Sequence, residues 1–274
     1  MWIRKDEVTA LSAKLRQAID GEIVEFSDNQ EGPLSLLRND LHTLVAQLGA
    51  ERDAANAAQA DLAKYMEDIS HQLKTPVTSM MLMADLLEGA PPERQAEFLA
   101  NIRESLARMD WLLDTLLKLA RLDAGAVTFE PQPVQTQVLL EAALRPLAIM
   151  LDVQDQQVVL RNDHVLFCDR RWTVEALTNL IKNGCEASPA GSTLIIDSGE
   201  NPLYQWLSVQ DSGRGLSREE MASLFTRFGS TKHGKGFGIG LPLALAIMRA
   251  QHGDIEVDAG GKGQGATFTL KFYK

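Results

Sequence analysis

The sequence has few cysteines and no long apolar run. Only two of its 274 residues are cysteines, Cys168 and Cys185, and their spacing fits neither a metal site nor a disulfide framework. The longest apolar run, Leu241 to Met248, is far shorter than the ~18 residues of a membrane span. No apolar stretch follows the charges near the start, so no signal peptide is predicted. The chain as given is expected to be soluble with reduced, buried thiols, and it is compatible with being a piece cut from a membrane protein.

Positive charge is also scarce. The sequence has 27 Lys and Arg against 37 Asp and Glu, which gives a net charge of -10. A broad nucleic-acid or anionic-membrane surface needs positive charge, so this balance argues against both kinds of partner. Hydrophobic residues at 45% and charged residues at 23% are ordinary for a globular protein. At ~150 residues per domain, the length suggests two domains.

Residues 37–123 are predicted to form two heptad helices joined by a short Gly/Pro loop at 88–92. Gly125 follows the second helix in the C′ position that ends many helices. A single hairpin exposes an apolar stripe, so two chains are expected to form a four-helix bundle, which makes the protein a homodimer. The alternative is a hairpin packed on the chain's own second domain. The apolar or small seam positions are Leu37, Leu41, Leu44, Leu48, Ala55, Ala58, Leu62, Tyr65 and Ile69, then Leu99, Ile102, Leu106, Met109, Leu113, Leu116 and Ala120.

From Val127 the pattern changes to mixed α and β. Short β-branched and aromatic runs alternate with longer helical segments, which predicts an α/β sandwich with helices on one face of a mixed sheet. The residues before 37 are mixed in character and contain a probable turn at 28–33. The strands are predicted at 158–160, 165–167, 194–196, 206–209, 255–257 and 267–270, and the helices at 171–187, 217–226 and 239–251.

The segment Asp68 to Pro76 places a histidine, His71, beside a helix-breaking residue. Pro76 lies inside an apparent helix, where it removes a backbone hydrogen bond and is expected to bend the helix and expose the imidazole. Much of an imidazole is unprotonated at neutral pH, so its nitrogen is a competent nucleophile. Taken alone, a surface histidine without a role is the better interpretation of the segment.

Two further segments carry residues suited to a nucleotide. Asn179 and Asn183 are four apart and share a helix face, and amide oxygens can ligate Mg²⁺ beside phosphate oxygens. Asp211 follows a predicted strand, with Gly213 and Gly215 behind it, so the backbone can approach a ligand closely. A carboxylate there can accept a hydrogen bond from the amine of adenine. A polar helix face and a glycine turn are the alternatives.

Glycines also crowd the entry to a helix near residue 240, where N-terminal amides can hold phosphate. The basic residues before them can neutralise phosphate charge or remain solvated. A last glycine-rich segment, 263–267, precedes the closing strand. The residues concerned are Arg227, Lys232, Lys235, Gly236, Gly238, Gly240 and Thr267.

These segments, together with Phe225-Thr226-Arg227-Phe228, resemble in their order the H-box, N-box, F-box and glycine boxes of the sensor histidine kinases, over about residues 37–274. The F-box is the segment 225–228. The resemblance implies that His71 accepts the γ-phosphoryl group of ATP, that Asn183 ligates Mg²⁺ and that Asp211 selects adenine. Thr75 matches a position that can orient a water for dephosphorylating a partner. The implied ATP site comprises Asn179, Asn183, Asp211, Gly213, Gly215, Arg227, Lys232, Gly236, Gly238, Gly240 and Thr267.

The resemblance also implies a domain organisation and partners. Residues 1–36 are expected to be a signal-relay segment, 37–125 the dimerisation and phosphotransfer helices, and 126–274 a Bergerat-type ATP-binding domain. The phosphoryl group is expected to pass to an aspartate of a response-regulator receiver domain. The chain is expected to be the cytoplasmic portion of an inner or plasma membrane sensor, which contacts the membrane only through a segment absent from this sequence. Phosphotransfer in cis or in trans depends on the handedness of the loop at 88–92.

The chain departs from the family at two places. Gln72 stands where the family has an acidic residue as the base beside the histidine, and an amide cannot take up a proton at neutral pH. Glu186 and Ala187 replace a common Lys-Tyr pair that contacts phosphate and adenine. Two rivals follow. One is an ATPase related to gyrase and heat-shock chaperones, which carry Glu where this chain has Asn179. The other is a non-catalytic ATP-binding dimer, which Gln72 favours. A P-loop enzyme is excluded because the sequence has no Gly-x-x-x-x-Gly-Lys-Ser/Thr.

Overall fold

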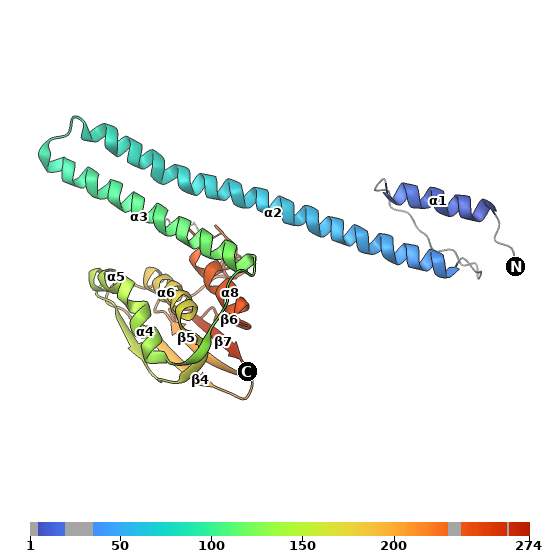
Figure 1. Cartoon of the computed structure of the whole chain (residues 1–274). Helices are drawn as coiled ribbons and strands as arrows, with labels where there is room; N and C mark the ends of the chain where they lie inside the picture. The colour runs from blue at the N-terminus through green and yellow to red at the C-terminus, as the bar shows by residue number, and fades with distance from the viewer. Residues whose placement is uncertain (1–4, 20–34, 230–236, 262) are drawn as a thin grey trace. The chain divides into compact units, whose positions relative to one another are not determined.

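A computed structural model describes residues 5–19, 35–229, 237–261 and 263–274 (Figure 1). The chain divides into two compact units, residues 1–69 and 70–274. The turn predicted at 28–33 lies outside the described residues. Within the described ranges the helices are α1 (Lys5–Ile19), α2 (Ser35–Leu87), α3 (Pro92–Asp123), α4 (Thr136–Leu144), the 3-10 helix η1 (Arg145–Leu147), α5 (Ala148–Val153), α6 (Arg170–Ala187), α7 (Arg218–Ser223) and α8 (Gly240–Ala250). The strands are β1 (Pro131–Gln135), β2 (Gln157–Leu160), β3 (Val165–Asp169), β4 (Thr193–Glu200), β5 (Tyr204–Gln210), β6 (Gly253–Asp258) and β7 (Thr267–Tyr273).

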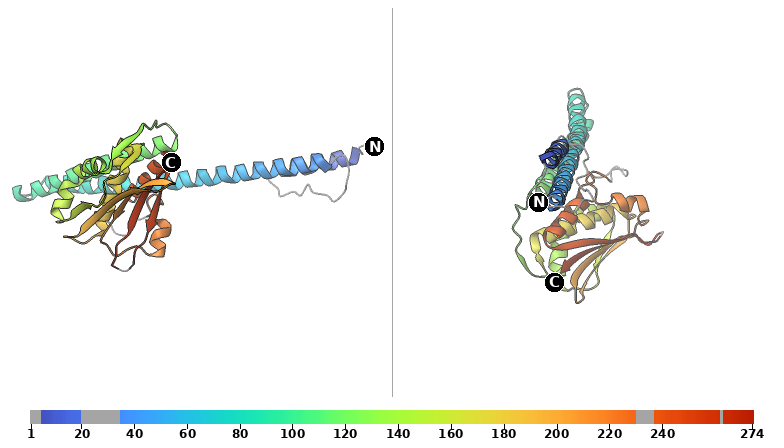
Figure 2. Two further views of the ribbon diagram at one scale, coloured as in Figure 1. Left: turned by 90° about the horizontal axis from the view of Figure 1, so that it is seen from below. Right: turned by 90° about the vertical axis from the view of Figure 1, so that its right-hand side faces the viewer.

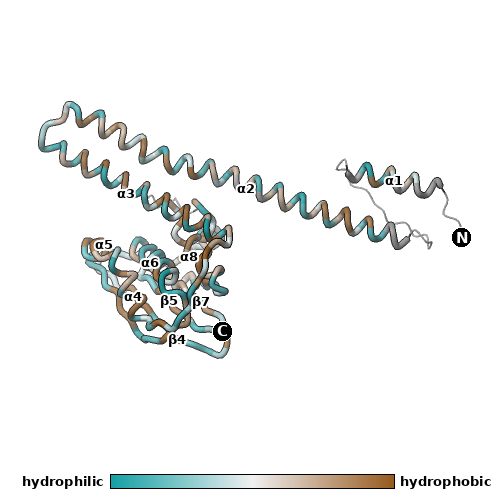
Figure 3. The backbone as a smooth tube through the Cα atoms, in the orientation of Figure 1, coloured by the Kyte–Doolittle hydropathy of each residue, from teal (hydrophilic) through white to brown (hydrophobic). Residues whose placement is uncertain are grey.

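The predicted helical hairpin is confirmed as α2 and α3. Figure 3 shows hydrophobic residues recurring along both helices between hydrophilic ones. Helix α2 continues through Pro76, which is buried and has no N–H to donate to the carbonyl of Gln72. In the described ranges, no helix is both long and apolar enough to cross a membrane.

Helix α3 ends as its sequence predicts. Gly125 has φ +61°, the left-handed conformation that glycine adopts at a helix C′ position. Its N–H donates to the carbonyl of Leu122, and the N–H of Ala126 donates to the carbonyl of Arg121 at 2.9 Å. These two hydrogen bonds make a Schellman motif, which turns the chain sharply out of the helix.

The second half of α3 has two apolar faces, where the sequence pattern suggested one. Residues of the predicted seam remain exposed, with Leu106 at 52% and Leu113 at 47%. The neighbouring face carries Leu112 and Leu119, both at 0% exposure, and α3 packs against α8 there. The alternative of a hairpin packed on the chain's own second domain therefore holds for this face.

The C-terminal half is an α/β sandwich, as predicted. A five-stranded sheet has the order β2-β4-β5-β7-β6, in which β2 and β4 are parallel and the other pairs are antiparallel. Helices α4, α6 and α8 lie together on one side of this sheet (Figures 1 and 2). Strands β1 and β3 form a separate antiparallel pair.

The core lies between that sheet and its helices. Alternate residues of β4 and β7 point inward, including Leu194, Ile196 and Phe268, all at most 1% exposed. Fully burying one such side chain stabilises the fold by about 1.5–3 kcal/mol. Cys168 and Cys185 are buried free thiols, as expected, and burial raises the pKa of each to about 11.

Candidate functional site

Asp211 is the most firmly held residue of the candidate nucleotide site. It follows β5 directly and is 5% exposed. Its Oδ1 accepts hydrogen bonds from the backbone N–H groups of Gly213, at 2.8 Å, and Ala266, at 3.0 Å. Among the described residues no hydrogen bond reaches Oδ2, so one oxygen fixes the carboxylate and the other keeps its lone pairs for a ligand. This arrangement suits the exocyclic amine of adenine.

The glycines around Asp211 make room for protein backbone. A Cβ on Gly213 would lie 2.7 Å from the carbonyl oxygen of Ala187, and one on Gly265 would lie 2.0 Å from the carbonyl oxygen of Asp211. That Gly213 also lets the backbone approach a ligand stays a prediction. Because Gly213 has no side chain, the loop can pack against the end of α6, where the carbonyl of Ala187 occupies the space next to a Cβ position. Gly215 has φ +79° and meets Ala259 in the same way.

Helix α6 presents the two asparagines on one face. Asp169 caps the helix by accepting a hydrogen bond from the N–H of Trp172. Asn179 is 8% exposed, and its Nδ2 donates to the carbonyl of Glu175. A Cβ on Gly240 would lie 2.7 Å from Asn179 Oδ1, so the first residue of α8 fits closely against this amide. Asn183 lies one turn further along α6 and is partly exposed.

A serine that the motif analysis did not single out ties α6 to the loop after Asp211. The Ser188 hydroxyl donates to the carbonyl of Gly184 at 2.7 Å and accepts from the N–H of Ser212 at 3.0 Å. Nearby, Gln156 Nε2 donates to the carbonyls of Cys185 and Pro189. The end of α6 and the Asp211 loop are thus held as one structure. Only the order Ser-Pro after the helix signals this role in the sequence.

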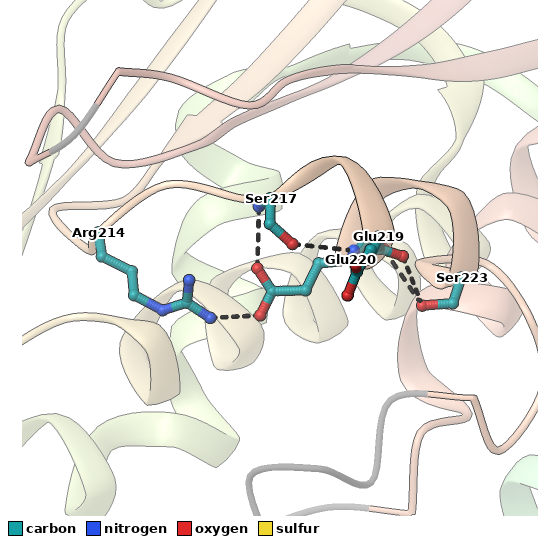
Figure 4. Close-up of polar contacts among 5 residues, drawn as sticks. All are labelled: Arg214, Ser217, Glu219, Glu220 and Ser223. Atoms are coloured by element: carbon teal, nitrogen blue, oxygen red, sulfur yellow. Dashed lines mark hydrogen bonds and ion pairs between the residues drawn. The ribbon is translucent and has the colours of Figure 1, made fainter.

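The loop leaving Asp211 is secured a second time, at α7. Ser217 and Glu220 form a capping box, in which each side chain accepts a hydrogen bond from the other residue's backbone N–H (Figure 4). Glu220 also forms an ion pair with Arg214. The backbone N–H of Ser217, aided by the Arg214 side chain, lowers the pKa of Glu220 to about 2. The helix predicted at 217–226 is shorter in the structure, where α7 begins at Arg218 and ends at Ser223.

The structure brings the predicted F-box and the glycines before α8 together. The backbone N–H of Phe228 donates to the carbonyl of Gly238 at 3.0 Å, and Gly238 has φ +67°. Lys232 and Gly236 lie outside the described residues. Thr267 starts β7 between Gln210 and Asp258 of the neighbouring strands.

Arg227 pairs with a carboxylate at the end of α3. Its Nη2 contacts both carboxylate oxygens of Asp123, at the end of α3, at 2.9 and 2.8 Å. Lys182, which the motif analysis passed over, lies with its Nζ 4.6 Å from the centre of the Trp111 ring. The position of Lys182 directly before Asn183 is the sequence signal that could have marked it as a candidate site residue.

His71 lies on an exposed face of α2. An open hollow of about 440 Å³ on this face is lined by His71, Lys74, Thr75, Thr78, Ser79 and Leu82. The Thr75 hydroxyl donates to the carbonyl of His71 at 3.3 Å, so it is one helical turn from the imidazole. Gln72 is not among the lining residues, and in the described ranges no hydrogen bond joins it to His71.

No group of three or more His, Cys, Asp or Glu residues that could hold a metal occurs in the described part of the chain. Mg²⁺ does not require one, because it keeps several waters and takes one or two protein ligands beside substrate phosphates. The partly exposed amide of Asn183 fits that donor set.

Comparisons with known proteins identify both halves. The family model for the His Kinase A (phospho-acceptor) domain matches residues 61–125, and the model for the histidine kinase-, DNA gyrase B- and HSP90-like ATPase matches residues 168–274. Together they cover more than half of the chain. The chain belongs to the sensor histidine kinases.

Curated sensor kinases support this membership. The chain is 28% identical over 261 residues to the sensor protein kinase PmrB of Pseudomonas aeruginosa, covering 92% of this chain and 54% of PmrB. It is 27% identical over 267 residues to the signal transduction histidine-protein kinase BaeS of Escherichia coli, covering 89% of this chain and 54% of BaeS. This histidine kinase chain therefore spans about half the length of the curated relatives it matches.

Solved structures share its fold. The Acinetobacter baumannii histidine kinase AdeS superposes with a TM-score of 0.63 at 24% identity, covering 74% of this chain and 97% of AdeS. Histidine kinase ThkA, solved in complex with the response regulator protein TrrA, gives a TM-score of 0.62 at 18% identity, covering 82% of this chain and 65% of ThkA. The predicted fold class, a helical hairpin followed by an α/β ATP-binding domain, is confirmed.

Proposed function

We propose that this histidine kinase transfers the γ-phosphoryl group of ATP to His71. The observation that carries the proposal is the presence, in one chain, of a phospho-acceptor domain containing an exposed His71 and an ATPase-family domain containing the fixed carboxylate of Asp211. In the transfer, a nitrogen–phosphorus bond forms at the imidazole while the bond between the γ-phosphorus and the β–γ bridging oxygen breaks. ADP leaves with that oxygen, and the imidazole loses its N–H proton.

Each site residue has a proposed part. Asp211 Oδ2 accepts a hydrogen bond from the adenine amine, and Asn183, with Asn179 behind it, ligates Mg²⁺. The ion would neutralise charge on the phosphates. The amides at the start of α8, beside Gly238 and Gly240, face phosphate oxygens. Arg227, Lys232, Gly236 and Thr267 complete the proposed site.

Gln72 and Thr75, which lie near His71 on the same helix, have separate proposed roles. Gln72 cannot remove the imidazole proton as a carboxylate would, so autophosphorylation is expected to be slow. Thr75 is proposed to orient a water for dephosphorylation of the partner, since its hydroxyl lies one turn from His71 in the same hollow.

We propose a homodimer whose two hairpins form the four-helix bundle. Its support is the exposed apolar seam, including Leu99 at 42% and Leu106 at 52%, which a second hairpin would cover. The phosphoryl group is proposed to pass from His71 to the aspartate of a response-regulator receiver domain. The chain is further proposed to act on the cytoplasmic side of a membrane.

Incubation with γ-labelled ATP and Mg²⁺ tests the proposal. An acid-labile label on the protein, lost in His71→Ala and kept in His42→Ala, is the expected result. His42 is a matched control, because it is an exposed histidine on the same helix. Release of free phosphate without protein labelling would indicate the gyrase-like ATPase, and binding without either would indicate the non-catalytic dimer.

A further inference from the structure

Helix α3 contacts the candidate nucleotide site through Asp123. The Asp123 carboxylate takes the Arg227 guanidinium with both oxygens, at 2.8 and 2.9 Å. A guanidinium N–H donates to a carboxylate oxygen and to a phosphate oxygen alike, and here the single nitrogen Nη2 reaches both carboxylate oxygens. Asp123 therefore offers Arg227 the kind of acceptor that a nucleotide phosphate would offer.

A second contact comes from Trp111, on the same helix. The Nζ of Lys182 lies 4.6 Å from the centre of the Trp111 ring, within the range of a cation–π interaction. Phe237 also stacks on this ring, with ring centres 6.0 Å apart and planes 17° apart. Lys182 is the one basic residue in the sequence from Asn179 to Ala187, since position 186 is a glutamate.

The surrounding packing holds α3 in this place. Leu112 and Leu119 have no exposed surface, and Leu119 belongs to the core of the ATP-binding domain. Lys118 Nζ also lies 2.9 Å from a carboxylate oxygen of Glu175 on α6. Burial acts to lower the pKa of Lys118, but hydrogen bonds to Asp114 and Glu175 outweigh it and raise the pKa. Apolar burial and the Lys118–Glu175 ion pair therefore hold the stretch of α3 between Trp111 and Asp123 in place.

We propose that Asp123 and Trp111 of α3 occupy two phosphate-binding cations, Arg227 and Lys182, so that docking of α3 and binding of Mg-ATP oppose each other. The inference rests on the proposed function, and it adds Lys182 to the residues that neutralise phosphate. The carboxylate and the negative face of the indole take the place of phosphate oxygens. By thermodynamic linkage, each process weakens the other by the same factor.

Binding measurements on the full chain test this competition. Asp123→Asn and Trp111→Leu should each tighten binding of a non-hydrolysable ATP analogue with Mg²⁺, measured by calorimetry, by about two- to five-fold. Adenosine, which has no phosphates, should bind all variants equally. Asp110→Asn is the matched control, because it removes the same charge from an exposed position of α3, and it should change neither affinity.

A double-mutant cycle separates direct competition from general loosening of the domain. Arg227→Gln should weaken binding of the analogue, and adding Asp123→Asn to it should then give no further gain. Equal gains for adenosine and the analogue, or a full gain from Asp123→Asn without Arg227, would overturn the inference. If the unaltered chain binds no analogue at all, the proposed function itself fails. Normal binding that none of these variants changes leaves the proposed function standing and rejects only the competition.

Discussion

Replacing Asp211 by asparagine changes a single atom at the point where the chain is proposed to read adenine. The two backbone N–H groups that now bond Oδ1, from Gly213 and Ala266, can bond only the carbonyl oxygen of the new amide. The amide nitrogen must then take the place of Oδ2. An acceptor that faces the adenine amine becomes a donor, while the loop keeps its two backbone hydrogen bonds.

The expected loss is one charge-assisted hydrogen bond to the ligand, about 1.5–3 kcal/mol. That corresponds to ATP binding about 10- to 150-fold weaker at 25 °C. The same geometry predicts a change of preference. Inosine triphosphate carries an oxygen where ATP carries the amine, so Asp211→Asn should bind it more tightly than the unaltered chain does.

Calorimetric titration of both nucleotides, with a thermal melt of each variant, measures these effects. The melting temperature should hardly change in Asp211→Asn. It should fall in Asp211→Ala, which leaves two buried N–H groups without an acceptor. An asparagine variant that folds normally and binds ATP within two-fold of the unaltered chain would refute the assignment of Asp211 to the adenine amine.

Three other predictions follow from the hairpin and from α7. Gln72→Glu should raise the single-turnover autophosphorylation rate by about 3- to 30-fold, since it places a general base beside His71; a slower variant, with a strongly impaired Gln72→Ala, would make Gln72 an orienting residue. A fragment of residues 37–123 should sediment as a dimer at a concentration on the order of tens of micromolar, and a monomer would count against the bundle. Glu220 has its pKa lowered from 4.5 to about 2, so its stabilising contribution is present above about pH 4.5 and is lost as the pH falls toward 2. Glu220→Gln should flatten the acid side of the plot of melting temperature against pH, and an unchanged acid slope would contradict the stabilising role given to the Glu220 carboxylate.

The sequence predicted most of the fold because its periodicities are strong. Heptad spacing located α2 and α3, and Gly125 located the end of α3, since only a left-handed residue closes a Schellman motif without strain. The pattern did not predict β1, because Pro131 and Pro133 argue against a strand; they are tolerated in a two-stranded pair. Helix α1 was also missed, since residues 1–36 show no clear period.

At the candidate site, the sequence identified the residues of local motifs but not the contacts between distant segments. Asp211 stands out because a carboxylate and glycines follow a strand. The hydrogen bond from Ala266 to it, 55 residues away, has no local signature. The pairing of Asp123 with Arg227 is equally invisible, because each residue alone reads as a solvated charge. Sequence reasoning therefore proposed candidate ligand-facing groups but did not find the groups that hold them in place.

Because α3 has two apolar faces, its rotation about its own axis affects the packing on both of them. Successive residues on a helix are turned by about 100°, so Leu112 and Leu113 belong to adjacent faces of one rod. The face of Leu113 is exposed, and the face shared by Leu112 and Leu119 is buried, with Leu119 in the core of the ATP-binding domain. A rotation of α3 that repacks one face must displace the other, so in the proposed dimer this helix would couple the packing of the bundle to the packing of the ATP-binding domain.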